Sequence, residues 1–142
     1  MRASEGRRAA LPASHLPRVR VRYAPAALLD PGGVEHPLSL LQDLEVVALA
    51  GLAHPAGFLR TLGRLGARVS SAELYPDHYP YPPREAARLA ARGRALGARI
   101  VTTEKDAVRL PAGFAAWTVR LGVEVLEGEE HLRRALRLPA AP

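Results

Sequence analysis

Strand-like and helix-like hydrophobic patterns alternate along the middle of this 142-residue chain. Residues 44–50 are almost continuously apolar, as in a strand covered on both faces, and apolar residues recur at helical spacing over 55–65. The same pair of patterns follows at 68–75 and 83–96. Strand–helix series of this kind fold with right-handed crossovers, which make the connected strands parallel. The alternation therefore predicts an α/β domain with a mainly parallel sheet.

Further elements are predicted on both sides of this series. Arginine alternates with apolar side chains over 18–23, the pattern of a half-buried strand, which we place at the sheet edge before the break at Pro31–Gly33. Residues 99–102 indicate a short strand, and 104–110 a short helix that Pro111 closes. The remaining predicted elements are one or two strands over 117–121 and 123–126, and a last helix over 129–138.

Length and composition favour one domain. A chain of 142 residues that is 48% hydrophobic can bury a single core. We expect one α/β domain over 18–138, a basic and flexible segment over 1–17, and a disordered tail over 139–142. No apolar run reaches the length of a membrane span, so we expect a soluble protein. The chain has no cysteine, which rules out disulfides and thiolate ligands and fits a reducing compartment.

The net charge of +6 is unevenly placed, because the first 22 residues contain six arginines and one glutamate. Such a segment either binds an anionic membrane surface or is a solvated tail, which is the commoner outcome. Arg84, Arg88 and Arg92 share one face of a predicted helix, and this stripe is open to the same two interpretations. No nucleic-acid-binding signature is present, so we expect no nucleic-acid partner. No histidine pair has the spacing of a metal site, so we expect no bound zinc.

The segments that follow the predicted parallel strands are the places to look for chemistry, because ligands bind at the carboxyl ends of such strands. Gly51 follows the first of these strands and permits close approach of the backbone to a phosphate. Asp77 and His78 follow the second strand, and the threonine–lysine segment 102–106 follows the third. We expect all three segments to line one edge of the sheet.

The loop around Asp77 and His78 is the strongest catalytic candidate, because four prolines stiffen it and three tyrosines flank the pair. A histidine can transfer protons near neutral pH or donate to a phosphate, and a neighbouring carboxylate fixes its charge and tautomer. In the alternative interpretation, both side chains cap loop amides and the tyrosines are packing residues. His54 is a weaker candidate, and we expect His36 and His131 to be isolated and exposed.

Lys105 is the one lysine among the 20 Lys and Arg residues, which suggests a position that needs a compact ammonium group. Thr103 has the position of a helix N-cap and Asp106 that of its capping partner, so Lys105 falls in the first helical turn. A cation there opposes the helix dipole unless an anion shares the site. Lys105 therefore either faces a phosphate or carboxylate, or is an ordinary solvated side chain.

A set of motifs occurs in a specific order along the chain. They are Val46–Gly51, Pro55 with Phe58–Leu59, Leu65–Ala67, Asp77–His78 with Tyr81, and Val101–Leu110. In this order they resemble the C-terminal part of the tetraacyldisaccharide 4'-kinase family, and the resemblance extends from Val19 to Leu138. It implies a three-layer, Rossmann-like fold, that of the C-terminal lobe of this P-loop kinase.

The resemblance also implies an activity in lipid A synthesis. In that family the γ-phosphate of ATP passes to the 4'-hydroxyl of an acylated glucosamine disaccharide phosphate, with Mg²⁺ as cofactor. The implied substrate is an anionic glycolipid, and the implied location is cytoplasmic, peripheral on the inner face of the cytoplasmic membrane.

Site residues are carried over from the resemblance position by position. His78 matches the histidine that faces the phosphoryl-transfer cleft, with Asp77 beside it. The acidic residue that activates the sugar hydroxyl in partnership with this histidine lies in the family's N-terminal half. The chain departs from the family at Tyr79, where a second histidine is usual, and at Leu52–His54, where a glycine-rich turn is usual. The positions that match the family's substrate- or phosphate-binding signature are Thr102, Thr103, Glu104, Lys105 and Asp106.

No G-x-x-x-x-G-K-[ST] signature occurs in the 142 residues. Phosphoryl transfer needs backbone amides and a lysine around the phosphates, with a hydroxyl and an acid on Mg²⁺. The resembled family carries these parts in its N-terminal half. We therefore expect this polypeptide to be inactive alone and to need an N-terminal kinase lobe or a separate polypeptide that supplies it. The alternatives are a stand-alone anion- or nucleotide-binding module and a degenerate, non-catalytic remnant.

Overall fold

The computed structural model describes residues 17–139. The predicted flexible segment, apart from Pro17, and the last three residues of the predicted tail lie outside this range. The described residues divide into two compact units, one formed by 23–122 and the other by 17–22 together with 123–139. The candidate site residues all belong to the 23–122 unit.

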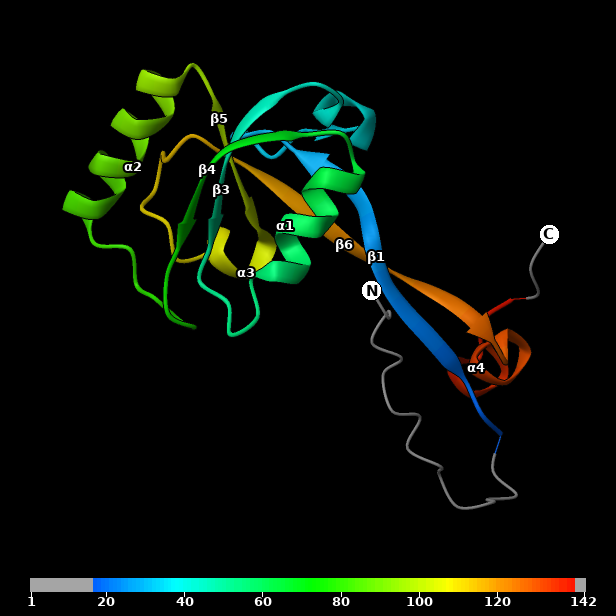
Figure 1. Cartoon of the computed structure of the whole chain (residues 1–142). Helices are drawn as coiled ribbons and strands as arrows, with labels where there is room; N and C mark the ends of the chain where they lie inside the picture. The colour runs from blue at the N-terminus through cyan, green and yellow to red at the C-terminus, as the bar shows by residue number, and fades with distance from the viewer. Residues whose placement is uncertain (1–16, 140–142) are drawn as a thin grey trace. The chain divides into compact units, whose positions relative to one another are not determined.

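Within the described residues, six strands form one sheet in the order β2-β1-β6-β5-β3-β4 (Figure 1). β3 pairs in parallel with β4 and β5, and β5 pairs in parallel with β6, whereas β1 and β2 are antiparallel. The predicted mainly parallel sheet is confirmed. The strands are β1 (Arg20–Leu29), β2 (Glu35–His36), β3 (Glu45–Ala50), β4 (Arg68–Leu74), β5 (Arg99–Thr103) and β6 (Ala116–Glu127). The helices are η1 (Leu38–Leu41), α1 (Ala56–Arg64), α2 (Pro83–Leu96), α3 (Glu104–Ala107) and α4 (Glu129–Leu136).

The central strand β3 is buried on both faces, as its continuous apolar run predicts. Side chains alternate between the faces of a strand, so Val46 joins one core cluster and Val47 the other. Leu62 of α1 belongs to the first cluster and Leu89 of α2 to the second. The two helices therefore flank β3 from two sides (Figure 1), which gives the three layers expected of this fold class.

The observed bounds of α2 agree with the predicted helix. Pro83 stands at the first helical position, where its missing N–H is not needed. Gly97 ends the helix with φ of 59°, a left-handed conformation that glycine adopts without steric cost. The shorter helix α3 stops at Ala107, although the sequence pattern predicts helix as far as Leu110.

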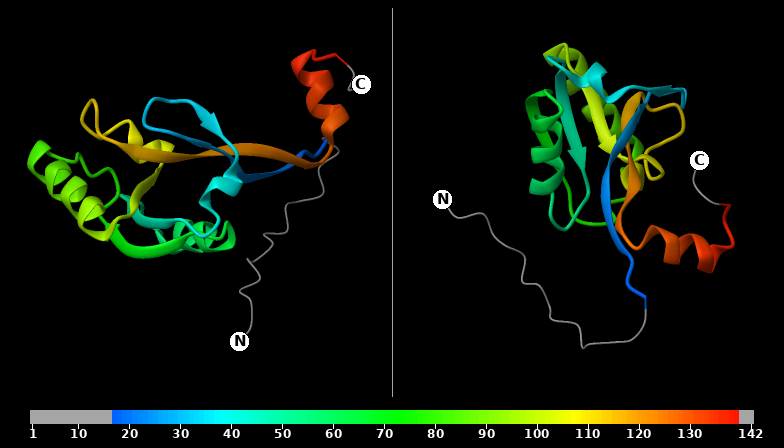
Figure 2. Two further views of the ribbon diagram at one scale, coloured as in Figure 1. Left: turned by 90° about the horizontal axis from the view of Figure 1, so that it is seen from above. Right: turned by 90° about the vertical axis from the view of Figure 1, so that its right-hand side faces the viewer.

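The predicted position of the first strand is wrong. β1 extends through Leu29 and lies between β2 and β6, so it is not at the edge. A turn after Asp30 folds the chain back into the short edge strand β2 (Figure 2), and the Asp30 carboxylate accepts hydrogen bonds from the N–H groups of Gly32 and Val34 at 2.9 Å each. This Asx-type turn converts the expected break into a hairpin.

His36 also differs from its predicted exposed and isolated setting. Its Nε2 lies 2.9 Å from the Asp30 carboxylate, and its ring centroid lies 5.3 Å from that of Trp117. The hydrogen bond with His36 holds the pKa of Asp30 below its ordinary value.

β6 is one continuous strand, where the sequence allows either one or two. Gly122 lies inside it, and a Cβ added there would stand 3.0 Å from the Cβ of Ala26. The glycine therefore permits close packing of the backbone and does not interrupt the strand.

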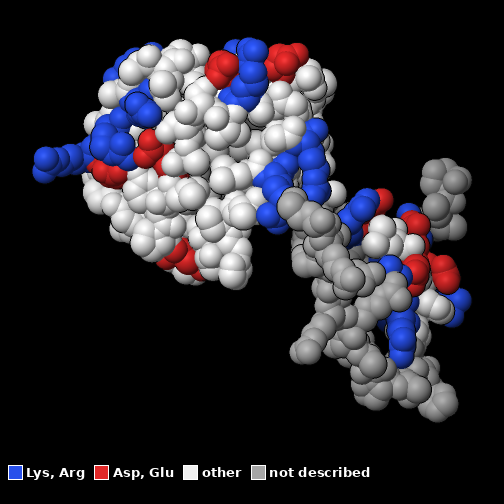
Figure 3. Space-filling view, viewed as in Figure 1, with Lys and Arg blue, Asp and Glu red and all other residues white. Residues whose placement is uncertain are grey.

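Much of the arginine charge is already paired within the protein. Arg88, in the middle of the predicted stripe on α2, contacts Glu73 at 2.7 Å and Glu85 at 2.9 Å. In Figure 3, blue and red side chains accordingly lie next to one another over α2. In the smaller unit, Arg20 pairs with Glu127 at 2.5 Å. These exposed pairs neutralise charge locally, so the face of α2 that carries Arg88 is not an uninterrupted basic stripe.

Replacement of Leu62 by alanine tests the α1 side of the core. Leu62 is fully buried, so Leu62→Ala should lower the free energy of unfolding by about 2–5 kcal/mol through lost contacts and a residual cavity. Leu74, which is 47% exposed, is the matched control, and Leu74→Ala should have a much smaller effect. Urea denaturation of both variants measures the difference. Equal losses would contradict this description of the core.

Candidate functional site at the strand ends

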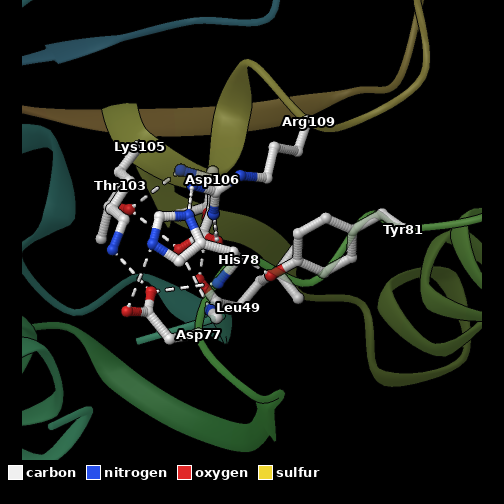
Figure 4. Close-up of polar contacts among 10 residues, drawn as sticks. Leu49, Asp77, His78, Tyr81, Thr103, Lys105, Asp106 and Arg109 are labelled. Carbon is white, nitrogen blue, oxygen red and sulfur yellow. Dashed lines mark hydrogen bonds and ion pairs between the residues drawn. The ribbon is translucent and has the colours of Figure 1, made fainter. Parts of the chain in front are cut away.

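The three segments that follow β3, β4 and β5 meet at one edge of the sheet, as predicted from the strand order. Gly51, after β3, and Tyr81, in the loop after β4, both hydrogen-bond to Asp106 of α3. Asp77, also in the loop after β4, contacts Lys105 of α3. Figure 4 shows these side chains converging from the separate loops.

Asp106 is fully buried and lies at the centre of the cluster. Its carboxylate accepts hydrogen bonds from the Gly51 N–H at 3.1 Å, the Tyr81 hydroxyl at 3.1 Å and the Thr103 hydroxyl at 3.0 Å. Its own N–H donates to Thr103 Oγ1 at 3.2 Å, so the predicted N-cap is confirmed. A buried carboxylate is tolerated only when it is hydrogen-bonded or paired, and Asp106 is both.

Gly51 is fitted closely against this carboxylate. A Cβ at position 51 would lie 2.8 Å from Asp106 Oδ1, a distance that real Cβ atoms essentially never show, and 3.0 Å from the Tyr81 hydroxyl oxygen, which would have to shift. The backbone at Gly51 therefore approaches Asp106 and Tyr81 closely, where the sequence pattern predicts a close approach to a phosphate. Its N–H, which we expected to face a phosphate, already donates to Asp106.

Tyr81 and Arg109 are two members of the cluster to which the sequence pattern gave no role. Burial, followed by the neighbouring charge of Asp106, raises the pKa of Tyr81 above its ordinary value, so its hydroxyl stays protonated and donates. Arg109 Nη1 lies 3.5 Å from the Asp106 carboxylate, and Arg109 Nη2 lies 2.8 Å from His78 Nδ1. Both residues lie within the sequence motifs, but only the tertiary contacts reveal what they bind.

His78 lies at the surface end of this network. Its backbone φ of 61° is in the left-handed region, which is uncommon for a residue with a side chain. A guanidinium has no acceptor atom, so Nδ1 of His78 accepts from Arg109 and the neutral ring carries its proton on Nε2. Nε2 lies 3.6 Å from the Asp77 carboxylate, beyond an ordinary hydrogen bond. The Nε2–H is therefore available to a ligand oxygen.

Asp77 and Lys105 form an ion pair beside His78, with Lys105 Nζ 2.5 Å from Asp77 Oδ1. The hydrogen bond from Lys105, supported by the nearby His78, holds the pKa of Asp77 below its ordinary value of 3.8. The side chains of Lys105 and Asp77 are 43% and 36% exposed, so solvent and ligands reach the pair. The anion that the position of Lys105 calls for is supplied here by a carboxylate of the protein.

Two other predicted site residues point away from this pair. Thr102 is fully buried, and its hydroxyl donates to the carbonyl of Leu49 at 2.8 Å, which ties β5 to β3. Glu104 lies 3.4 Å from Arg120 of β6. Of the residues expected to bind phosphate, Lys105 therefore has the most accessible donor. Gly51 and Thr103 hydrogen-bond to Asp106, and these bonds hold α3, which carries Lys105, in place.

Residues 2–138 match the family model of tetraacyldisaccharide-1-P 4'-kinase, LpxK. A curated tetraacyldisaccharide 4'-kinase from Anaeromyxobacter sp. (strain K) is 46% identical over 147 residues, which cover 96% of this chain and 39% of that protein. This chain belongs to the tetraacyldisaccharide 4'-kinase family. The resemblance identified from the ordered motifs is thereby confirmed.

Other tetraacyldisaccharide 4'-kinases agree with this assignment. The protein from Methylobacterium radiotolerans is 48% identical over 92 residues, covering 64% of this chain and 28% of that protein. LpxK from Aquifex aeolicus, solved in complex with ATP, has a TM-score of 0.60 at 23% identity and covers 87% of this chain and 36% of its own. That likeness confirms the predicted fold. The chain spans no more than 39% of the length of these three tetraacyldisaccharide 4'-kinases.

Replacement of Asp106 tests whether it holds the site together. Asp106→Ala should lower the free energy of unfolding by about 3 kcal/mol, because the Gly51 N–H, the Tyr81 hydroxyl and the Arg109 guanidinium lose a buried partner. Asp77→Ala is the matched control and should change stability little, since Asp77 is exposed. Chemical denaturation checks both. An Asp106→Ala protein as stable as the parent would show that the Asp106 carboxylate does not hold these segments together.

The Asp77–Lys105 pair predicts a specific titration. Lys105→Ala should raise the pKa of the Asp77 carboxyl toward 3.8, because the hydrogen bond that holds it low is removed. A lowered folded-state pKa means that the stability from this pair is complete above the unfolded value and is lost as pH falls through the folded value. Carbon-13 NMR of the side-chain carboxyl measures the shift, with Arg94→Ala as the control. An unchanged Asp77 pKa in Lys105→Ala would contradict the ion pair.

Proposed function

We propose that this chain acts as the C-terminal lobe of a tetraacyldisaccharide 4'-kinase. The observation that carries the proposal is the convergence of Asp77, His78 and Lys105 at the carboxyl ends of parallel strands, supported from below by the buried Asp106. This is the edge at which open α/β sheets bind ligands. Family membership supplies the reaction, which is transfer of the γ-phosphate of ATP to the 4'-hydroxyl of an acylated disaccharide phosphate.

His78 is the residue to which we assign contact with the reacting groups. In its neutral form it offers an Nε2–H to a phosphate oxygen, and Arg109 fixes the ring through Nδ1. Because Nδ1 accepts from Arg109 and Nε2 already carries a proton, the His78 ring has no free lone pair, so it acts as a donor to the phosphate and the proton of the sugar hydroxyl passes to a base that the N-terminal lobe supplies. Lys105 then supplies positive charge to a transferring phosphoryl group.

The phosphate-cradling parts of the reaction are not found among the 142 residues, which contain no G-x-x-x-x-G-K-[ST]. Backbone amides, a lysine and a Mg²⁺-binding hydroxyl carry most of the catalysis in P-loop enzymes. We propose that an N-terminal lobe, as an additional segment or a separate polypeptide, supplies them. The two lobes together would then enclose the phosphates.

The residues of this chain do not fit a magnesium site. Within 17–139, no three His, Cys, Asp or Glu side chains are grouped so that they could hold a metal ion. Asp106 has no solvent exposure and its oxygens already bind protein donors, and Asp77 is paired with Lys105. We therefore assign Mg²⁺ to the N-terminal lobe. ATP fits this chain only through donors such as Lys105 and the Nε2–H of His78.

The proposed substrate is an anionic glycolipid, which places the reaction at a membrane surface. No helix within residues 17–139 combines the length and the apolar character that a membrane span requires. We propose peripheral association with the inner face of the cytoplasmic membrane. The exposed cations of the chain, part of a net charge of +6, favour such a surface electrostatically.

A reconstituted kinase tests the proposal. The part of the Anaeromyxobacter relative that precedes its matching region would be fused to this chain, and transfer of labelled phosphate from ATP to tetraacyldisaccharide 1-phosphate would be measured. We expect activity from the fusion and none from residues 1–142 alone. His78→Ala should lower kcat of the fusion by about 100-fold or more, the scale of a lost hydrogen-bond donor to the charge that develops in the transition state. Lys105→Ala should reduce kcat/KM.

Matched variants separate catalysis from folding. His131→Ala removes a half-buried histidine of α4, and Arg94→Ala removes an exposed arginine of α2. Neither side chain is bonded to Asp77, His78 or Lys105, so the fusion should keep its activity. Activity of residues 1–142 alone would refute the need for a second lobe. A fusion that turns over normally with His78→Ala would refute the assigned role of His78. Binding of ATP by the lone chain, lost in Lys105→Ala but without activity in any fusion, would favour the stand-alone binding module.

A further inference from the structure

Arg109 connects the buried part of the strand-end cluster to His78. It stands two residues after α3, and its side chain is only 21% exposed. Its Nη1 lies 3.5 Å from the buried Asp106 carboxylate, and its Nη2 lies 2.8 Å from Nδ1 of His78. Figure 4 shows the Arg109 side chain extended toward these two residues. One guanidinium therefore contacts a buried anion and a surface imidazole at the same time.

The contact with Asp106 fixes the position of the guanidinium. Among the described side chains that contact this carboxylate, Arg109 is the charged one, whereas Tyr81 and Thr103 offer neutral hydroxyls. A buried anion attracts a cation more strongly than an exposed anion does, because little solvent screens the interaction. Nη1 is itself buried and makes no hydrogen bond within the described part of the chain. Charge attraction to Asp106 is therefore what holds this end of the guanidinium.

The contact with His78 fixes the proton of the imidazole ring. The His78 side chain is 70% exposed, so few neighbours restrain it. Its backbone N–H donates to Asp77 Oδ1 at 3.0 Å, which holds the main chain but not the ring. A ring that carried a proton on Nδ1 would place two donors against each other at 2.8 Å. The contact with Arg109 therefore exists only when the proton is on Nε2.

We propose that Arg109 is a positioning residue that selects the Nε2–H form of His78, and that Asp106 anchors Arg109 for this purpose. The proposal rests on the proposed function, because it explains how His78 is kept as a hydrogen-bond donor. A lysine cannot replace Arg109 here, since its single ammonium nitrogen lacks the two separated nitrogens with which the guanidinium contacts Asp106 and His78. The competing explanation is that Arg109 only neutralises Asp106 and does not affect the histidine.

Nitrogen-15 NMR of the purified chain tests the proposal without any kinase activity. With labelled histidine, the shifts of the two ring nitrogens show which of them carries the proton, and His78→Ala assigns the signals by their disappearance. At about pH 7.5, where an ordinary histidine is mostly neutral, we expect a single form of His78 with Nε2 protonated. Arg109→Ala should lose this single form, and both nitrogens should move toward the averaged shifts of a ring that exchanges its proton between them.

Three further variants separate positioning from stability. Tyr81→Phe removes a neutral donor from the same carboxylate, so it should lower the stability of the fold while the His78 proton stays on Nε2. Arg109→Lys keeps a positive charge beside Asp106 but should not restore the single form of His78. This variant carries the same test if Arg109→Ala does not fold. Arg94→Ala removes an exposed arginine of α2 and should leave the spectrum of His78 unchanged.

A single Nε2–H form that persists in Arg109→Lys or Arg109→Ala would overturn the proposal, since neither variant keeps the guanidinium. Loss of that form in Tyr81→Phe would also overturn it, because reduced stability alone would then explain the effect.

The reconstituted fusion separates this proposal from the proposed function. There, Arg109→Ala should lower kcat by up to about 100-fold, the scale of a misplaced reacting group, and should change KM for ATP less. An active fusion in which Arg109→Ala keeps its kcat would refute the role of Arg109 and preserve the proposed function. The expected NMR result without activity in any fusion would do the reverse.

Discussion

The buried carboxylate of Asp106 is the constraint on which the strand-end site depends. A charged group with no solvent exposure costs several kcal/mol unless donors surround it, and here the donors come from other segments. Gly51 contributes a backbone N–H from the end of β3, and Tyr81 contributes a hydroxyl from the loop after β4. The hydrogen bonds to this one carboxylate therefore fix the relative positions of the segments that follow β3, β4 and β5.

This constraint also explains the backbone of the loop after β4. Tyr81 has a φ of 46° and is 1% exposed, so a sterically uncommon conformation is kept in the core. Tyr75 and Tyr79 pack around it, with ring centroids 5.2 Å from that of Tyr81 in both cases. The aromatic packing and the hydrogen bond to Asp106 together stabilise the loop that presents His78. Arg109 contacts both Asp106 and His78, so it connects the buried carboxylate to the histidine at the surface.

Local patterns were enough to predict the fold class and that the segments after β3, β4 and β5 lie at one edge of the sheet. The burial of β3 follows from a continuous apolar run, and the Thr103 cap follows from a short motif, because both depend on neighbours in sequence. The roles of Tyr81 and Arg109 depend on distant contacts. Tyr81 contacts Asp106, 25 positions away in sequence, and Arg109 contacts His78, 31 positions away. Only the folded chain brings those side chains together, so no local pattern identifies their partners.

The errors at the first strand have the same origin. Alternating arginine and apolar side chains establish that a strand is half-buried, but they do not say which strands become its neighbours. β1 gains β2 on one side because the Asp30 turn reverses the chain, and it has β6 on the other. A hairpin partner of two residues is too short to produce a hydrophobic period of its own. Strand order at this end is therefore set by turn chemistry and long-range pairing.

Lys105 connects phosphate binding to the proposed catalytic histidine through its ion pair with Asp77. Its ammonium group pairs with the Asp77 carboxylate, beside His78. Because the pair is partly exposed, its attraction is weakened by solvent, and a phosphate can replace the carboxylate at small cost. The displaced Asp77 would remain next to His78, and its carboxylate would no longer be shared with a cation. Binding of a phosphate at Lys105 would thus change the charges around the proposed catalytic histidine, which couples binding at Lys105 to the reaction.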